Sequence, residues 1–270
     1  NDTAQGGDGN DYISAGDGRQ SLDGGAGNDT LSAGAGDDFL VSGTGVDHLD
    51  GGAGMDSAMI DRSDLSVAFS IDLSAGPAAL TTASDGTTVT GVERINITGG
   101  SGADTITGWA QSDILDGGAG DDVINGGGGD DNLYGGAGAD RLIGGLGDDS
   151  LDGGAGDDRL LGGAGNDSLI GGLGIDTADY SDASGSVTVN LALTVTQNTG
   201  AGGGDWLLSI ENLVGSAFAD VLIGDAGANT IDGGDGADTL EGGAGGGYLQ
   251  GGNGADGMLA RAKNLHSSFG

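Results

Sequence analysis

A nine-residue repeat with glycine at fixed places constrains this chain more than any other feature. Twenty complete nonapeptides occur in three uninterrupted runs, at residues 6–59, 99–179 and 215–259. The unit GGAGDDVIN at 117–125 shows the pattern, with glycine at positions one, two and four, aspartate at position six and an aliphatic residue at position eight. A unit of nine residues is too short to bury a core by itself, so the repeats must stack on one another to form one.

The repeat predicts a chain that turns and extends in alternation. We expect the glycines at positions one, two and four to take positive φ angles in tight turns. The three residues centred on position eight are expected to form a short strand. Two nonapeptides complete one coil of 18 residues, and successive coils stack at about 4.8 Å. The predicted fold is an all-β, right-handed parallel β-roll or β-helix of 18-residue coils in three blocks, interrupted by two β-strand inserts.

Composition excludes several classes of protein. The 270 residues include 65 glycines, and 42 acidic against 7 basic residues give a net charge of −35. This charge argues against binding of nucleic acid or of an anionic membrane surface. The absence of cysteine excludes disulfides and thiolate metal sites, and no apolar run approaches the roughly 18 residues of a transmembrane helix. Few aromatics and high charge are typical of disordered chains, but disorder alone does not explain glycine and aspartate on a fixed grid.

Aspartate at position six is the candidate metal ligand. It occupies this position in 17 of the 20 repeats, and repeats n and n+2 lie on the same edge of the predicted roll. Ca²⁺ takes roughly six to eight oxygen ligands in irregular geometry, which two stacked loops can supply. The exceptions are Gln20, Asn229 and Gly247, where metal occupancy stays open. The candidate ligands are Asp11, Asp29, Asp38, Asp47, Asp56, Asp104, Asp113, Asp122, Asp131, Asp140, Asp149, Asp158, Asp167, Asp176, Asp220, Asp238 and Asp256.

The pattern resembles the G-G-x-G-x-D-x-U-x motif of the RTX family, the hemolysin-type calcium-binding repeat, in which U is a large aliphatic residue. The resemblance implies that one loop gives the carbonyls of positions two and four with its aspartate, and the other gives those of positions one and three with its aspartate. A typical site would join Gly118, Gly120 and Asp122 with Gly135, Ala137 and Asp140. The loop carbonyls expected to act in this way include those of Gly118, Gly120, Gly127, Gly129, Gly135, Ala137, Gly144, Leu146, Gly153, Ala155, Gly162 and Ala164.

The charge of the stacked loops predicts that folding depends on the metal. Counting pairs of aspartates two repeats apart gives about 12 sites for Ca²⁺. Without metal the carboxylates repel one another, and the thin core cannot compensate. We therefore expect an unfolded chain without calcium and a folded one with calcium, because metal binding and folding are one event.

The grid divides the chain into six segments. These are a first block at 1–59, which starts in the middle of a repeat, an insert at 60–98, a second block at 99–179, an insert at 180–214, a third block at 215–259 and a tail at 260–270. Because the first residues form the back half of a repeat, we expect the chain to be cut from a longer protein. The inserts resemble each other and predict two strands each, with a structural role favoured over a platform for a ligand.

No catalytic constellation is recognisable in the sequence. His48 stands at an outward position of its repeat, His266 lies in the tail, and motifs of zinc proteases, serine hydrolases and phosphate-binding loops are missing. Arg141 and Arg159 stand 18 residues apart, so they are expected to stack on one face. They either relieve the negative charge of the body or contact an anionic extracellular polysaccharide.

The sequence therefore predicts a non-catalytic, calcium-binding module, monomeric when folded. The resemblance implies a secreted bacterial parent protein, exported by the type I machinery and folding outside the cell. Two alternatives stay open. The chain could be the C-terminal module of an extracellular enzyme such as a protease, lipase or polysaccharide epimerase or lyase, or it could be a spacer in an adhesin or matrix protein.

Overall fold

β-strands are the only regular elements that the structure describes, and most of them pair in parallel. The computed structural model describes residues 1–259 and the backbone of residues 266–268, and within these ranges it contains strands and no helix. The chain divides into two compact units, Asn1–Leu133 and Tyr134–Gly270. The predicted all-β roll of 18-residue coils is confirmed, and the predicted tail at 260–270 lies almost entirely outside the described residues.

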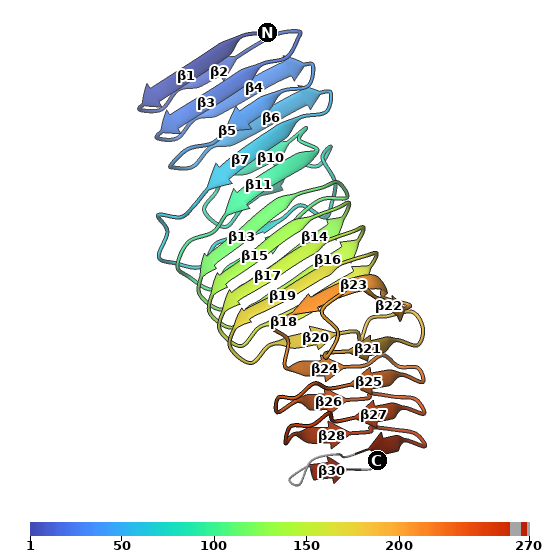
Figure 1. Cartoon of the computed structure of the whole chain (residues 1–270). Coiled ribbons are helices and arrows are strands. Elements are labelled where there is room, and N and C mark those ends of the chain that lie inside the picture. The colour runs from blue at the N-terminus through green and yellow to red at the C-terminus, as the bar shows by residue number, and fades with distance from the viewer. Residues whose placement is uncertain (260–265, 269–270) are drawn as a thin grey trace. The chain divides into compact units, whose positions relative to one another are not determined.

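The strands are short and follow one another closely along the chain (Figure 1). In the first unit they are β1 (Thr3–Asp8), β2 (Tyr12–Ser14), β3 (Ser21–Ala26), β4 (Thr30–Ala35), β5 (Phe39–Val41), β6 (His48–Ala53), β7 (Ser57–Asp61), β8 (Ser70–Asp72), β9 (Thr81–Thr82), β10 (Thr88–Thr90), β11 (Arg94–Thr98), β12 (Thr105–Thr107), β13 (Ile114–Ala119) and β14 (Val123–Gly128). Strand β15 (Asn132–Ala137) contains the boundary. In the second unit they are β16 (Arg141–Leu146), β17 (Ser150–Ala155), β18 (Arg159–Ala164), β19 (Ser168–Leu173), β20 (Thr177–Asp179), β21 (Thr188–Asn190), β22 (Gln197–Gly200), β23 (Gly203–Leu208), β24 (Asn212–Val214), β25 (Val221–Ile223), β26 (Thr230–Asp232), β27 (Thr239–Glu241), β28 (Tyr248–Gln250), β29 (Gly257–Leu259) and β30 (His266–Ser268).

The register of the ladders shows that one coil holds two repeats. Within the runs, each residue pairs with the one 18 positions further along, as Leu31 does with Leu49 and Leu151 with Leu169. Odd and even repeats therefore form separate parallel sheets. In the first unit the sheets run β1-β3-β5-β7-β11-β13, β2-β4-β6-β10-β9 and β8-β12-β14, and in the second β17-β19-β23-β22, β16-β18-β20-β24-β26-β28-β30 and β21-β25-β27-β29.

The aliphatic residue at position eight forms the core of each unit. Leu31 and Leu115 in the first unit, and Leu151 and Leu169 in the second, are 0% exposed. Their neighbours at positions seven and nine point outward, because side chains alternate along a strand. The core is therefore one side chain deep on each sheet, which leaves little apolar area to stabilise each coil.

Most strands in the first two runs are longer than the three residues predicted, whereas β2, β5, β12 and β20 have three residues. Strand β17 continues through the next two glycines, because Gly154 stays in register with Gly172 and the ladder extends into the turn. In the third run the strands are three residues long, as predicted, and β27 (Thr239–Glu241) is an example.

Glycine at position one is needed for space and not for a positive φ. The expectation holds at most glycines of positions two and four, of which Gly154 with φ 98° and Gly156 with φ 140° are examples. It is wrong at position one, where Gly233 lies outside the left-handed region. A Cβ at Gly233 would stand 2.5 Å from Oδ2 of Asp238 and 2.9 Å from the carbonyl oxygen of Gly251. Any side chain there would displace the position-six carboxylate of the same repeat.

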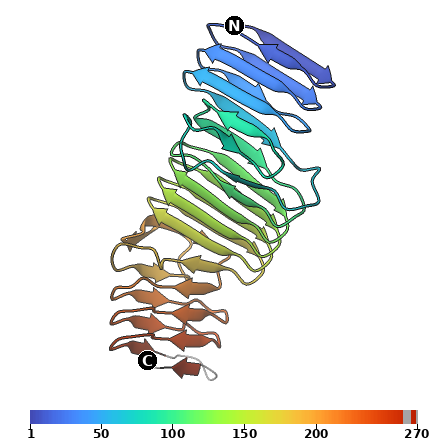
Figure 2. The same cartoon turned by 180° about the vertical axis from the view of Figure 1, so that it is seen from behind.

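The two inserts continue the sheets of their own units. In the first, β10 pairs with β6, β11 lies between β7 and β13, and β8 pairs with β12. In the second, β23 pairs with β19, β24 lies between β20 and β26, and β21 pairs with β25. Each insert thus supplies four strands, not the two predicted. The chain between β7 and β8 loops out beside the stacked coils in both views (Figures 1 and 2).

Replacing Leu151 by alanine tests the contribution of the core. Leu151 is 0% exposed, so Leu151→Ala leaves a cavity in a thin core and should lower the free energy of unfolding by about 2–5 kcal/mol. Leu146 in the same unit is 67% exposed, and Leu146→Ala should change it by less than about 0.5 kcal/mol. Urea denaturation at one fixed, saturating calcium concentration measures both, and equal midpoints for the two variants would contradict this description of the core.

Candidate metal centre

The carboxylates of position six form a ladder that crosses from coil to coil. In most repeats, one oxygen of the carboxylate accepts a hydrogen bond from the backbone N–H of the position-six residue 18 places earlier. Asp11 N–H donates to Oδ1 of Asp29 over 2.8 Å, and Asp140 N–H donates to Oδ1 of Asp158 over 2.8 Å. This bond fixes the orientation of each carboxylate and leaves its second oxygen pointing into the loop of its own repeat.

The second oxygen, Oδ2, is buried without a hydrogen-bond donor in many of these loops. Such an atom is unfavourable, because it has lost its water and gained no partner. Within residues 1–259 this holds for Oδ2 of Asp11, Asp29, Asp38, Asp56, Asp158, Asp167, Asp176 and Asp238. A row of such oxygens needs a cation or a proton.

Burial makes these carboxylates hard to ionise without a cation. Burial, together with the nearby carboxylates of Asp205 and Asp149, raises the pKa of Asp167 to about 7. Burial likewise raises the pKa of Asp56 and of Asp176 to about 6. At neutral pH the metal-free fold therefore carries ionised groups in an environment that disfavours them.

Backbone carbonyls lie beside the donor-less oxygens. Oδ2 of Asp238 and the carbonyl oxygen of Gly251 both approach the point where a Cβ of Gly233 would stand. We use the term loop gap for the space between such a carboxylate and the loop that lies 18 residues later in the sequence. Among residues 1–259, no three His, Asp or Glu side chains come close enough to hold a metal. An ion in a loop gap would thus be held by two carboxylates and several carbonyls, a set of hard oxygen donors that fits Ca²⁺.

Some position-six aspartates differ because their own loop satisfies Oδ2. The N–H of the position-two residue turns inward and donates to it, with Trp109 N–H to Asp113 at 2.7 Å as an example. The position-two residue in these loops has no positive φ. The same closure joins Gly100 to Asp104 at 2.8 Å and Ser216 to Asp220 at 2.6 Å. The sequence offered a signal at Trp109 and Ser216, which replace the usual glycine.

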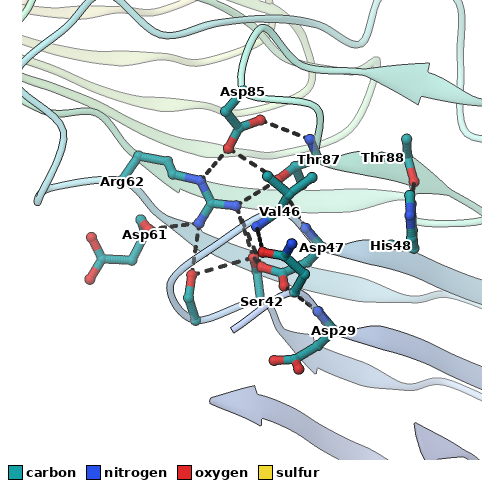
Figure 3. Close-up of polar contacts among 12 residues, drawn as sticks. Asp29, Ser42, Val46, Asp47, His48, Asp61, Arg62, Asp85, Thr87 and Thr88 are labelled. Carbon is teal, nitrogen blue, oxygen red and sulfur yellow. Dashed lines mark hydrogen bonds and ion pairs between the residues drawn. The ribbon is translucent and has the colours of Figure 1, made fainter. Parts of the chain in front are cut away.

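An arginine fills the loop gap of Asp47. Arg62, from the first insert, is 2% exposed. Its guanidinium donates to the carbonyl oxygen of Gly43 at 2.7 Å and to Oγ1 of Thr87 at 2.8 Å, and Nη2 lies 3.6 Å from Oδ2 of Asp47 (Figure 3). Nε also pairs with Oδ2 of Asp85 at 2.7 Å.

The partners of Arg62 correspond to those of an ion in an ordinary gap. Gly43 is position two of the repeat that holds Asp47, and Thr87 stands where the next position-six residue belongs, since Asp47 N–H lies 3.3 Å from its Oγ1. Ser42 Oγ also donates to Oδ2 of Asp47. Asp47 is therefore neutralised by the protein itself.

The second insert closes the corresponding gap with hydroxyl groups. Asp205 takes the place of a position-six residue, since its Oδ1 accepts the N–H of Asp167 at 3.0 Å. Its Oδ2 accepts Tyr180 Oη–H at 3.0 Å and Thr199 Oγ1–H at 2.9 Å. Asp205 was missed by sequence reasoning because it lies outside the nine-residue grid.

Comparison with protein families agrees with this chemistry. A family model described as the RTX calcium-binding nonapeptide repeat (4 copies) matches residues 1–31, 23–57, 96–124, 116–151, 143–178 and 214–249, more than half of the chain. The chain belongs to the RTX calcium-binding nonapeptide repeat family. A search of curated proteins found no match. RTX repeats bind Ca²⁺ and are typical of secreted bacterial proteins.

Two of the three RTX repeats without aspartate at position six have an amide there, and the two amides behave differently. Gln20 keeps its place in the ladder, because its N–H donates to Oδ1 of Asp38 at 2.6 Å and its Oε1 accepts Asp2 N–H at 2.8 Å. Asn229 instead closes its own loop, where its Oδ1 accepts the N–H of Asp225 at 2.9 Å. Both are neutral amides and add no charge to a loop gap.

Other residues singled out from the sequence lie on the outside of the RTX coils. His48 is exposed, and its Nδ1 lies 2.6 Å from Oγ1 of Thr88. Arg141 and Arg159 are paired on one ladder, as predicted, and Nη2 of Arg159 lies 2.7 Å from Oδ2 of Asp179. His266 has no described side chain. In the described part of the chain, no helix is long and apolar enough to cross a membrane.

Replacing Arg62 tests whether it neutralises Asp47. Arg62→Met keeps most of the buried volume but leaves Asp47 and Asp85 without their cation, and should lower the free energy of unfolding by about 3–5 kcal/mol. Arg19 is exposed, so Arg19→Met is the matched control and should have little effect. Thermal and urea unfolding at saturating calcium measure both, and equal stability of the two variants would rule out this role.

Acid should favour the metal-free fold. Burial raises the pKa of folded Asp167 to about 7, above the value near 3.9 of an unfolded aspartate. Between these values the folded chain binds protons that the unfolded chain does not, so stability is gained as pH falls and lost as pH rises through about 7. The far-ultraviolet circular dichroism of the metal-free chain should gain β-signal from pH 7 to pH 5. A loss of β-signal over this range would contradict the prediction.

Proposed function

We propose that this chain is a non-catalytic RTX module that folds when it binds calcium. The observation that carries this proposal is the row of buried Oδ2 atoms with no donor, of which Asp158 and Asp238 are examples. Their repulsion opposes folding, and the core of each coil is too thin to offset it. Ca²⁺ in the loop gaps supplies charge and ligands together, so metal binding and folding occur as one event.

The net charge supports the same coupling. The chain carries −35 at neutral pH, and this charge destabilises the compact state by self-repulsion. Each Ca²⁺ ion bound in a loop gap would offset two of these charges. Arg62, the only basic residue placed in a loop gap among residues 1–259, neutralises one position without metal.

Calcium also explains where such a chain would fold. Extracellular calcium modules bind at about 10⁻⁴–10⁻³ M, far above the calcium level of a cytosol. The chain would therefore stay unfolded inside a bacterium, pass outward through a type I secretion machinery as an unfolded segment of a larger protein, and fold outside the cell. In this proposal the module serves its parent protein by forming a rigid, calcium-dependent element.

Removing one open carboxylate tests the role of the ladder. Asp158→Asn keeps the acceptor for Asp140 N–H but removes the charge that faces the loop gap. We expect a higher calcium concentration at the folding midpoint and a loss of about 1–3 kcal/mol at a fixed calcium level. Asp157→Asn is the matched control, because Asp157 is the exposed neighbour at position five. Circular dichroism during calcium titration measures the midpoint, with Mg²⁺ as a second titrant that should not fold the chain.

The proposal is contradicted by either of two results. One is an equal β-signal in excess chelator and in millimolar Ca²⁺ at pH 7.5. The other is an equal shift of the calcium midpoint for Asp158→Asn and Asp157→Asn.

A further inference from the structure

Two of the three glutamates in the chain stand at equivalent places in the two inserts. Glu93 Oε2 accepts the N–H of Asp56 at 2.8 Å, and Glu211 Oε2 accepts the N–H of Asp176 at 2.9 Å. In the repeats, the same bond is made to the next position-six aspartate 18 residues later. The glutamates therefore continue the carboxylate ladder of Asp56 and of Asp176 into segments that lack the nonapeptide pattern.

The backbone confirms that each glutamate occupies position six. The N–H groups of Glu93 and Arg94 both donate to the carbonyl oxygen of Asp56, at 3.0 and 3.1 Å. In the second insert, Glu211 and Asn212 donate in the same way to the carbonyl oxygen of Asp176, at 3.0 and 2.8 Å.

The loop that precedes each glutamate is shorter than a repeat loop. The carbonyl that faces position one of the previous coil belongs to Gly91 in one insert and Ser209 in the other, two residues before the glutamate. In a repeat this carbonyl lies five residues before the aspartate. Gly91 has φ 60° and Ser209 has φ 54°. The left-handed turn brings the carbonyl to the gap, and the extra methylene of glutamate extends the reach of the carboxylate.

The opposite side of each gap is a buried carboxylate with no donor. Asp56 and Asp176 are 0% exposed, and their Oδ2 atoms have no hydrogen-bond partner. A Cβ at Gly51 would stand 2.9 Å from Oδ2 of Asp56, and one at Gly171 would stand 2.6 Å from Oδ2 of Asp176. The same hypothetical atoms would collide with the carbonyls of Gly91 and Ser209, so carboxylate and carbonyl converge on one point in each insert.

We propose that each insert holds one calcium ion of its own, outside the nonapeptide grid. The first lies between Oδ2 of Asp56, the carboxylate of Glu93 and the carbonyl of Gly91. The second lies between Oδ2 of Asp176, the carboxylate of Glu211 and the carbonyl of Ser209. The inference rests on the proposed function, since it requires that the chain binds calcium.

Each insert also meets a second ladder of position-six residues, and this ladder provides an internal comparison with the glutamate gaps. There Arg62 fills the gap of Asp47, and Tyr180 with Thr199 satisfies Asp205. Each insert thus ends one ladder of position-six residues with its own side chains and adds a glutamate to the other. Ions are expected in the glutamate gaps and not in the gap of Arg62.

Counting ions in single variants tests the proposal. Native mass spectrometry of the calcium-loaded chain gives the number of bound ions. We expect Glu93→Gln and Glu211→Gln each to lose one ion, and the double variant two. Glu241→Gln is the matched control, because Glu241 is position nine of its repeat and the last residue of β27, outside any loop gap, and this variant should lose no ion. The proposal is overturned if Glu93→Gln and Glu211→Gln keep as many ions as Glu241→Gln.

A second measurement covers variants that fail to fold. Anomalous scattering from crystals of the calcium-loaded wild-type chain locates each ion directly. Peaks between Asp56 and Glu93 and between Asp176 and Glu211 support the proposal, and empty gaps beside peaks in the repeat loops overturn it while leaving the proposed function intact. A wild-type chain that binds no calcium at all would instead refute the proposed function.

Discussion

The structure depends on one unfavourable arrangement, a buried carboxylate in almost every coil with only half of its hydrogen-bonding capacity met. Oδ1 of Asp158 is held by a backbone N–H, whereas its Oδ2 faces the loop without a donor. The nine-residue period repeats this arrangement every half coil. Stacking coils at the spacing of a β-ladder brings the carboxylates of one edge close together, so the geometry that satisfies the backbone also concentrates negative charge. A divalent cation with many oxygen ligands removes both penalties at once.

The exceptions follow from the same physics. Where a loop lacks a left-handed glycine at position two, its N–H turns to the carboxylate, as at Trp109 and Ser216, and the charge is met by backbone donors. Where an insert interrupts the grid, a side chain is the partner of the buried carboxylate. This is the guanidinium of Arg62 in one insert and the hydroxyl of Tyr180 in the other. In each case a buried acid either has donors from the protein or faces a gap suited to a cation.

Much of the fold could be predicted because the repeat leaves few alternatives. The 18-residue coil, the parallel ladders and the inward side chain of Leu151 all follow from the spacing of glycine, aspartate and leucine. The closed loop of Asp104 could not be predicted, because Gly100 occupies position two of its repeat just as glycine does in the open loops. The roles of Glu93 and Asp205 lie outside the grid, and only the register of the ladders places them at position six.

The sequence by itself determined the period, the core and the chemistry of the loops, since each depends on residues within one coil or on the identical residue one coil away. Only the tertiary structure decided which carboxylates face a donor-less gap in loops with glycine at position two, since that depends on the φ angle of this glycine and on side chains from inserts distant in sequence. Arg62, for example, lies in an insert, and the nine-residue period does not predict its contact with Asp47. Position one is a further example. Its glycine can be read from the sequence, but the carboxylate of the same repeat, which leaves no space for a side chain there, comes close only in the folded coil.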